Sequence, residues 1–184
     1  SVWQGLAVPV PRDRPPRHDF GVGLPDATLF PADTWRRLLA RQLRGSQLEA
    51  DYADPAGHPG LRAAIARHVA VSRGVRADAQ DVIVTHGAQG AFDLVARVLL
   101  EPGARVAVEE PGYPPPRLLF ESCGARVTPV PVDAAGLDVA ALPPDARLVY
   151  VTPSHQFPLG VPMSHPRRAT LLEWAERRGA VIVE

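Results

Sequence analysis

VIVTHGAQGAFDLVARVLLEPGARVAVEEPGYP, residues 82–114, contains two β-branched runs on either side of an amphipathic helical pattern. Residues 82–85 predict a short strand, and apolar residues then recur at helical spacing until Pro102-Gly103 ends the pattern. Residues 105–108 predict the next strand. A strand, a helix of ten or more residues and a second strand predict a βαβ unit, whose two strands pair in parallel.

The same alternation continues toward the C-terminal end of the chain. The patterns predict a helix over 114–123, strands over 126–132 and 148–152, a helix that Ser164 caps and Gly179 ends, and a strand over 181–183. The predicted fold class is therefore α/β, with a mostly parallel sheet that carries helices on both of its faces.

Two more helices are predicted on the N-terminal side. Apolar residues at helical spacing over 34–43 predict a short amphipathic helix, with Asp33 or Thr34 as its cap. A loop over 52–60 that contains glycine and proline opens a second helix, whose apolar residues share one face and which ends at Gly74.

Composition excludes several classes of protein. The chain has 184 residues, 46% of them hydrophobic, and a formal net charge of zero, so it can bury a core and lacks the basic excess of a nucleic-acid-binding surface. Residues 1–18 are rich in proline and arginine, and we expect an arm or interdomain linker there. No apolar run approaches the ~18 residues of a membrane span, and the first residues do not form a signal peptide. We therefore expect a cytoplasmic protein with no membrane partner.

The first candidate for chemistry is Thr85-His86-Gly87-Ala88-Gln89-Gly90, between a predicted strand and a predicted helix. Free N–H groups in the first turn of a helix bind anions, and small residues let a phosphate approach the backbone. The segment matches neither a Walker loop nor a GxGxxG fingerprint. It predicts a phosphate-binding turn, with an ordinary glycine-bearing turn as the alternative.

The second candidate is Tyr113, which follows Glu109-Glu110-Pro111-Gly112 at the end of a predicted strand. A tyrosine placed there can stack its ring on a planar ligand, or it can simply pack against the turn. The adjacent acids Glu109 and Glu110 do not predict a catalytic carboxylate pair, because successive strand residues point to opposite faces of a sheet.

The third candidate is the loop over 152–160, which gathers hydroxyl, imidazole and amide groups at the same edge of the predicted sheet. Ser154 and His155 are neighbours, but no nucleophile-elbow pattern surrounds them, so a serine hydrolase is disfavoured. The remaining histidines show no metal-ligand spacing, and the single cysteine, Cys123, supplies no zinc set. We therefore predict no metal site.

From residue 19 onward the chain resembles the fold-type-I, class I/II aminotransferases that use pyridoxal 5′-phosphate (PLP), and most closely the aminotransferase-like domain of MocR-type regulators in the GntR group. Six stretches carry the resemblance in order: GLPDATLFPADTW (23–35), YADPAGHPGLRAAIA (52–66), VTHGAQGAFDL (84–94), EEPGYP (109–114), VTPSHQFPLGVPMS (151–164) and RRATLLEWA (167–175). The regulator group favours the variant SHQFP found here, whereas many aminotransferases have Asn-Pro-Thr-Gly at residues 157–160.

The resemblance implies a role for each matching position. Gly87, Ala88 and Gln89 would hold the cofactor phosphate, and Tyr113 would stack on the pyridine ring. Tyr52 would reach the neighbouring subunit's phosphate, which implies a homodimer with shared sites. Gly23 would line the pocket for the substrate carboxylate. His155 or Gln156 would replace the missing asparagine that usually contacts the oxygen of the cofactor ring.

All twenty basic residues counted as lysine or arginine are arginine, so these residues offer no ε-amine for covalent attachment of PLP. We expect residues 19–184 to be the N-terminal part of a longer aminotransferase-like domain, inactive by itself, with no catalytic residue in this chain. The favoured function is an effector domain that senses an amino-acid-like molecule, in a regulator whose DNA-binding domain lies upstream. A free-standing aminotransferase, acting on an amino acid and a 2-oxo acid, and a dimerising scaffold without PLP are the alternatives.

Overall fold

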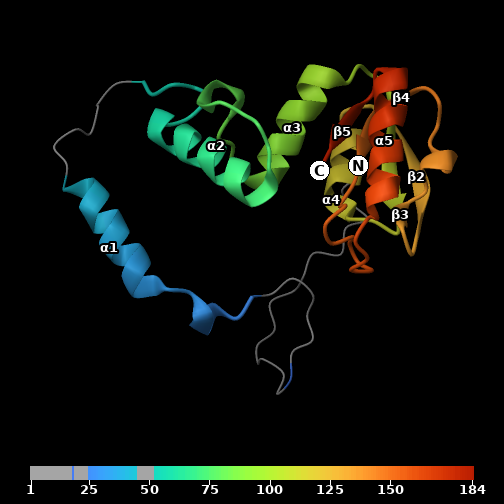
Figure 1. The fold of residues 1–184 in the computed structure, drawn as a ribbon. Helices are drawn as coiled ribbons and strands as arrows, with labels where there is room; N and C mark the ends of the chain where they lie inside the picture. The colour runs from blue at the N-terminus through green and yellow to red at the C-terminus, as the bar shows by residue number, and fades with distance from the viewer. Residues whose placement is uncertain (1–17, 19–24, 45–51) are drawn as a thin grey trace. The chain divides into compact units, whose positions relative to one another are not determined.

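The computed structural model describes residue 18, residues 25–44 and residues 52–184 (Figure 1). The chain divides into two compact units, one that contains Thr85–Glu184 and one that lies within Ala7–Val84. The first unit holds the sheet and the three segments predicted to carry chemistry.

The sheet has five strands, arranged in the order β3-β2-β1-β4-β5. They are β1 (Arg105–Glu110), β2 (Arg126–Asp133), β3 (Gly136–Leu137), β4 (Ala146–Tyr150) and β5 (Val181–Val183). All neighbouring strands are parallel except β2 and β3, which form an antiparallel pair. The predicted mostly parallel sheet is confirmed, and the short β3 is an element that the sequence patterns did not predict.

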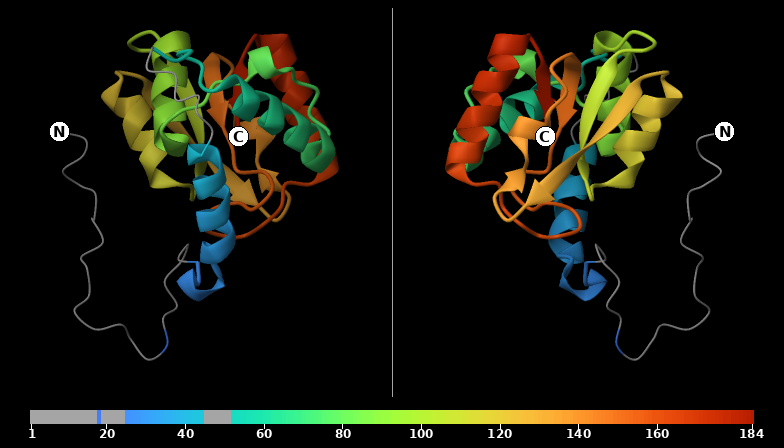
Figure 2. Two further views of the ribbon diagram at one scale, coloured as in Figure 1. Left: turned by 90° about the vertical axis from the view of Figure 1, so that its left-hand side faces the viewer. Right: turned by 90° about the vertical axis from the view of Figure 1, so that its right-hand side faces the viewer.

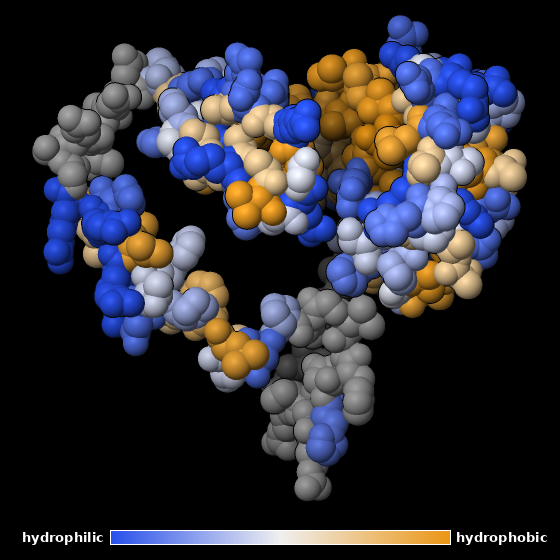
Figure 3. All heavy atoms as spheres, viewed as in Figure 1, coloured by the Kyte–Doolittle hydropathy of each residue, from blue (hydrophilic) through white to orange (hydrophobic). Residues whose placement is uncertain are grey.

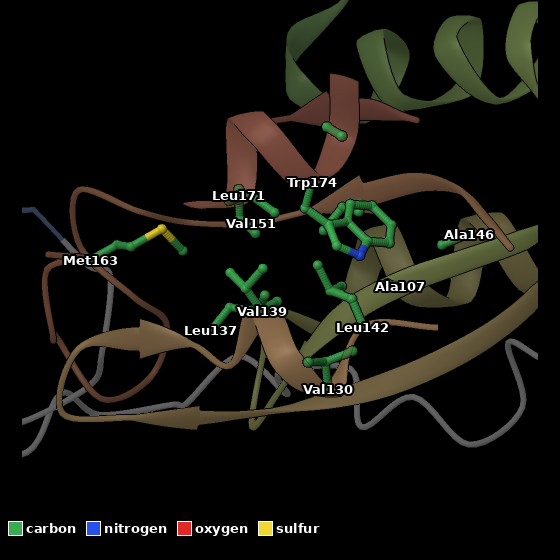
Figure 4. Packing of buried hydrophobic residues seen from close by; sticks show 12 residues of the cluster. Ala107, Val130, Leu137, Val139, Leu142, Ala146, Val151, Met163, Leu171 and Trp174 are labelled. Carbon is green, nitrogen blue, oxygen red and sulfur yellow. The ribbon is translucent and has the colours of Figure 1, made fainter. Parts of the chain in front are cut away.

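Helices cover both faces of this sheet, as predicted (Figure 2). The helices α3 (Gly87–Leu99) and α4 (Pro114–Ser122) pack on one face, and α5 (His165–Arg178) packs on the other. Side chains alternate along β1 between the two faces of the sheet. Val106 and Val108 belong to the hydrophobic cluster under α3 and α4, whereas Ala107 belongs to the cluster under α5. Figure 4 shows the cluster under α5, in which Leu171 and Trp174 of this helix pack against residues of the sheet and its loops.

The ends of α5 follow the predicted cap and stop signals. The Ser164 hydroxyl accepts a bond from the Arg167 N–H, and Gly179 ends the helix in the left-handed region at φ 62°. Both residues therefore have the roles that the sequence patterns predicted.

The second unit contains η2 (Ala27–Leu29), α1 (Ala32–Leu43), α2 (Pro59–Arg73) and η3 (Ala79–Asp81). Apolar side chains gather along α1 and remain exposed, among them Trp35 at 60% (Figure 3). The α2 helix ends at Gly74, as predicted, with φ 66°. Arg62 of α2 anchors the following segment, because its Nε donates to the carbonyl oxygens of Ala79 and Val82 at 3.0 and 2.8 Å.

The predicted cap of α1 was wrong. The N-cap is Pro31, and Asp33 lies inside the first turn, where its carboxylate forms an ion pair with Arg36 at 2.8 Å. Thr34 also lies inside the helix, and its hydroxyl accepts a bond from Arg37 at 3.1 Å. Both side chains therefore bond to arginines one turn along the helix and not to the helix end.

The strand predicted over 82–85 is also wrong. Its backbone is extended at Val82, with φ −103° and ψ 126°, but these residues form no ladder with any strand in the described part of the chain. The N–H of Val84 donates to the carbonyl oxygen of Ala56 at 2.8 Å. A β-branched run favours extended backbone, but a strand also needs a neighbour that pairs with it over several residues.

The fourth predicted strand is shifted by two residues. It begins at Ala146, which pairs with Arg105, and ends at Tyr150 instead of Thr152. Thr152 lies beyond the strand, where its hydroxyl bonds to Glu109 at 2.5 Å, and Pro153 after it has no N–H to extend a ladder. No helix in the described ranges is long and apolar enough to cross a membrane.

Candidate functional site

The carboxyl end of the parallel sheet brings the three predicted segments together within one unit. The turn after β1 and the loop after β4 both leave the sheet at this edge. The α3 helix begins at the same edge, since its Phe92 ring lies 5.2 Å from the ring of Tyr150, the last residue of β4. In open α/β sheets, ligands bind at this edge of the strands.

The first turn of α3 exposes the predicted phosphate-binding residues. Gly87, Ala88 and Gln89 are all exposed, and they follow His86, which is the N-cap without a side-chain capping bond. Gly87 has φ 70°, a left-handed conformation that favours glycine, and a Cβ placed there would meet no atom within 4 Å. The Gly87 N–H donates to the Thr85 carbonyl oxygen at 2.9 Å. The next N–H groups of the first turn lack partners inside a helix, so this open turn can accept an anion.

Tyr113 stands at the start of α4, with 41% of its surface exposed. Its ring lies 5.3 Å from the ring of Phe157 at an interplanar angle of 73°, which is an edge-to-face contact. Gly112 before it is tightly enclosed, because a Cβ there would lie 2.2 Å from the carbonyl oxygen of Glu109. The turn therefore presents the tyrosine ring with little freedom of the backbone behind it.

The residues predicted to replace the family asparagine have different surroundings. Gln156 is 2% exposed, and its Nε2 lies 2.7 Å from the Pro111 carbonyl oxygen and 2.6 Å from that of Phe157. Its Oε1 accepts a bond from the Leu159 N–H at 3.2 Å. Gln156 thus fastens the loop to the turn before Tyr113, whereas His155 is exposed. A contact of either side chain with a cofactor stays a prediction.

Two other predicted residues do not belong to the unit that holds these segments or are not described. Tyr52 is exposed and belongs to the second unit. Gly23 lies outside the described residues. Among the described residues no group of three potential metal ligands is found.

Three supporting residues were missed at the level of sequence. Glu109 and Thr152 are bonded to each other inside the site, and Arg168 of α5 donates to the carbonyl oxygens of Pro153 and Met163 at 2.7 and 3.0 Å. The alternation of β1 already placed Glu109 opposite Glu110, and the structure finds it 3% exposed whereas Glu110 is exposed. An acidic residue on the buried face of a strand was the available signal.

A small cavity of about 160 Å³ lies behind Tyr113, between the ends of β1 and β4, and Tyr150 forms part of its wall. Burial, together with the nearby charges of Glu109 and Tyr113, raises the pKa of the Tyr150 phenol from an ordinary value of 10.0 to about 12. The neutral phenol is therefore the favoured form in the folded protein.

This shift predicts a loss of stability in alkaline solution. Between pH 10 and about 12 the phenol ionises in the unfolded chain but not in the folded one, so unfolding becomes easier as the pH rises. The contribution is complete below pH 10 and is lost as the pH rises toward 12. Urea unfolding across this range should show a decline that Tyr150→Phe reduces. An equally steep decline in both proteins would contradict the assignment.

A larger cavity of about 620 Å³ lies at the opposite edge of the sheet, and four arginines line it, namely Arg97, Arg105, Arg126 and Arg147. Their guanidinium groups contact, respectively, the carboxylates of Asp93 and Asp145 and the carbonyl oxygens of Gly103 and Gly179. Two of the four charges are thus paired with carboxylates and two with carbonyl oxygens, and none of the predicted site residues lines this cavity.

Comparison with known proteins decides the family. The model of the class I and II aminotransferases matches residues 19–183. The chain belongs to this family. Its fold is that of the fold-type-I aminotransferases. It is 32% identical to an archaeal alanine:glyoxylate aminotransferase, with a TM-score of 0.80 over 86% of this chain and 42% of that one.

Regulators and enzymes both occur among the relatives of this chain. It is 43% identical over 178 residues to the probable rhizopine catabolism regulatory protein MocR of Rhizobium meliloti, covering 95% of this chain and 36% of that protein. It is 35% identical over 177 residues to the 2-aminoadipate transaminase of Thermus thermophilus, covering 93% of this chain and 43% of the enzyme. The chain therefore spans about two fifths of the length of these relatives.

The cofactor of the class I and II aminotransferases is PLP, and the residues at the carboxyl edge fit this group. A related structure, LysN of Thermus thermophilus, contains N-(5′-phosphopyridoxyl)-L-leucine and matches with a TM-score of 0.78 and 35% identity over 90% of this chain and 42% of that one. In the present chain the open turn at Gly87 can receive a phosphate, and the exposed ring of Tyr113 can receive a planar pyridine.

Proposed function

We propose that this chain is part of the PLP-binding effector domain of a MocR-type transcription regulator in the GntR group. The observation that carries the proposal is Phe157, which stands where many aminotransferases have asparagine and packs its ring against Tyr113 at 5.3 Å. An aromatic ring there cannot make the asparagine's hydrogen bond to the cofactor, and the SHQFP variant is typical of the regulators. The 43% identity to MocR supports the same assignment.

The proposed roles follow the geometry of the carboxyl edge. The N–H groups of Ala88 and Gln89 in the first turn of α3 hold the phosphate with the help of the helix dipole, and Gly87, without a side chain, lets the phosphate approach the backbone. Tyr113 stacks on the pyridine ring. When bound, PLP supplies an electron sink that reacts with primary amines, so the effector belongs to the amino-acid-like molecules.

The remaining roles concern the assembly. Tyr52 contacts the phosphate of the neighbouring subunit in a homodimer, and Gly23 lines the carboxylate pocket. Residues 1–18 link this domain to an upstream DNA-binding domain of a cytoplasmic protein. Because the chain contains no lysine, none of its own residues attaches PLP covalently.

The second candidate function is a free-standing aminotransferase that transfers an amino group between an amino acid and a 2-oxo acid. The 35% identity to the 2-aminoadipate transaminase of Thermus thermophilus over 93% of this chain supports it. Under this alternative the same PLP-binding residues take part in repeated catalytic turnover.

One experiment separates the two functions. The protein that carries this chain is loaded with PLP and offered a panel of amino acids with a 2-oxo acid acceptor, and its affinity for DNA from its own control region is measured in parallel. A regulator changes its DNA affinity when one amino compound is present and forms no more than about one equivalent of oxo acid per site. Many turnovers per site, with DNA affinity unchanged, favour the enzyme.

A substitution in the first turn of α3 tests the proposed phosphate site. Ala88→Asp is expected to weaken PLP binding at least about tenfold, since a carboxylate in the first turn of α3 repels a phosphate at close range. The same carboxylate interacts favourably with the helix dipole, by about 0.3–1 kcal/mol, so the folded state should not be destabilised. Titration with PLP and with inorganic phosphate measures the first effect, and thermal unfolding measures the second.

Ala88→Asn is the matched control, because it has nearly the same size as aspartate without the charge. It should bind PLP almost as well as the parent protein. Equal PLP affinities for the two variants would show that the phosphate lies elsewhere.

A further inference from the structure

The carboxylate of Glu109 lies inside the protein at the end of β1. Glu109 is 3% exposed, and its Oε2 accepts a bond from the Thr152 hydroxyl at 2.5 Å and lies 3.2 Å from Gln156 Nε2. Its other oxygen, Oε1, is buried and has no hydrogen-bond partner among the residues that the structure describes. Burying a carboxylate costs free energy of hydration, and hydrogen bonds inside the protein must offset that cost.

The bonds of Glu109 lead directly to the two aromatic rings at the candidate site. Thr152 connects Glu109 to Phe157, because its hydroxyl oxygen also accepts a bond from the Phe157 N–H at 3.2 Å. Gln156 connects Glu109 to the turn before Tyr113, because its Nε2 also lies 2.7 Å from the Pro111 carbonyl oxygen. One carboxylate therefore connects the end of β1 with the backbone that carries Phe157 and the backbone that carries Tyr113.

We infer that Glu109 is a positioning residue that sets the Tyr113–Phe157 ring pair, and through that pair the affinity of the site for PLP. The second half of this inference rests on the proposed function. Glu109 itself does not reach the candidate ligand, since its oxygens are buried beneath the loop over 152–160.

A glutamate side chain suits this position because its carboxylate oxygens can accept hydrogen bonds from two donors. The hydroxyl of Thr152 is its main donor, and the amide nitrogen of Gln156 is a weaker one at 3.2 Å, because this nitrogen also donates to the closer carbonyl oxygens of Pro111 and Phe157. Glutamine at residue 109 would keep the shape but bring an NH₂ group into the same pocket. One of its two orientations would set this donor against the Gln156 donor, and the other would leave it buried and unpaired.

The test compares Glu109→Gln with Glu110→Gln in the protein that carries this chain. Glu110 is the adjacent residue, exposed and paired with Arg117 at 3.0 Å, so its variant controls for the loss of a carboxylate. Two readouts are taken, namely hydrogen–deuterium exchange of the peptide over 152–160 and the dissociation constant for PLP. We expect Glu109→Gln to raise exchange in that peptide and to weaken PLP binding by about tenfold, the size typical of a lost charge-assisted bond.

A second pair of variants keeps the test decisive if Glu109→Gln does not fold. Thr152→Val removes the hydroxyl and should reproduce both effects, whereas Thr152→Ser retains it and should restore the parent behaviour. Because Thr152 acts through the same carboxylate, the double variant Glu109→Gln/Thr152→Val should lose no more PLP affinity than the more affected single variant.

Each outcome bears on a different statement. If Glu109→Gln matches Glu110→Gln in both readouts, the inference is overturned. If exchange rises while PLP affinity stays the same, Glu109 holds the loop but does not set the site, and the inference fails in that form. If the parent protein binds no PLP at all, the proposed function fails, while the exchange readout still decides whether Glu109 holds the loop.

Discussion

Gly112→Ala is expected to destabilise the protein and to displace the Tyr113 ring from its position at the candidate site. The added Cβ would lie 2.2 Å from the carbonyl oxygen of Glu109 and 3.0 Å from its carbonyl carbon, and both are backbone atoms that cannot turn aside. Relief therefore requires the turn between β1 and α4 to move. We expect the free energy of unfolding to fall by about 1–3 kcal/mol and PLP affinity to fall at least about tenfold. Urea unfolding and PLP titration measure the two effects.

Gly90→Ala is the control for this prediction of stability. Its Cβ would lie 3.7 Å from the Cβ atoms of Thr85 and His86, which is an ordinary van der Waals distance. Alanine also favours a helix over glycine by about 0.5–1 kcal/mol. Gly90→Ala should therefore be as stable as the parent or slightly more stable. A Gly112→Ala protein that matched the parent in stability and in PLP affinity would refute the description of the turn.

Phe120→Ala should cause the largest loss of stability. Phe120 of α4 is 0% exposed, and its ring lies 6.4 Å from that of Phe92 of α3, so it joins both helices to one face of the sheet. Removing a fully buried phenylalanine ring costs about 3–5 kcal/mol, because the transfer free energy is lost and a cavity remains. The change in the free energy of unfolding, measured by urea denaturation, tests this value.

Leu172→Ala serves as the matched control for the core. Leu172 lies on α5, but 63% of it is exposed, so its removal leaves no cavity. Its unfolding free energy should stay within about 0.5 kcal/mol of the parent value. A Phe120→Ala loss as small as that of Leu172→Ala would mean that α4 does not pack on the sheet as described.

The same polar groups connect stability with the candidate site. Glu109, Thr152 and Gln156 join the end of β1 to the loop after β4, and this loop carries Phe157 against Tyr113. Changes behind the rings are therefore expected to alter ligand affinity without touching the ligand. Ala88 differs from these residues, because Ala88→Asp changes the charge at the first turn of α3 and leaves the network of Glu109, Thr152 and Gln156 intact.

Local patterns were sufficient for much of the fold. Helical periodicity and end signals predicted α2 with its stop at Gly74, α5 with its cap at Ser164, and helices on both faces of a mostly parallel sheet. The strand predicted over 82–85 failed, although its residues are β-branched, because strand formation depends on a partner elsewhere in the chain. The antiparallel β3 was missed because two residues are too few to show an alternating pattern.

For the candidate site, the sequence by itself determined which segments gather at one edge. Tyr113 and the loop over 152–160 follow parallel strands, so their order in the chain placed them at the carboxyl end of the sheet. Gly87 was placed there through a strand over 82–85 that these residues do not form, although the turn does begin the helix α3. Only the tertiary structure decided which side chains are exposed at this edge and which lie buried behind them. Gln156 turned out to be buried and bonded to Pro111, and Glu109 became the centre of a network with Thr152, 43 residues away. Such contacts depend on the register of β1 against β4 and on the path of a loop, and neither is encoded in a local period.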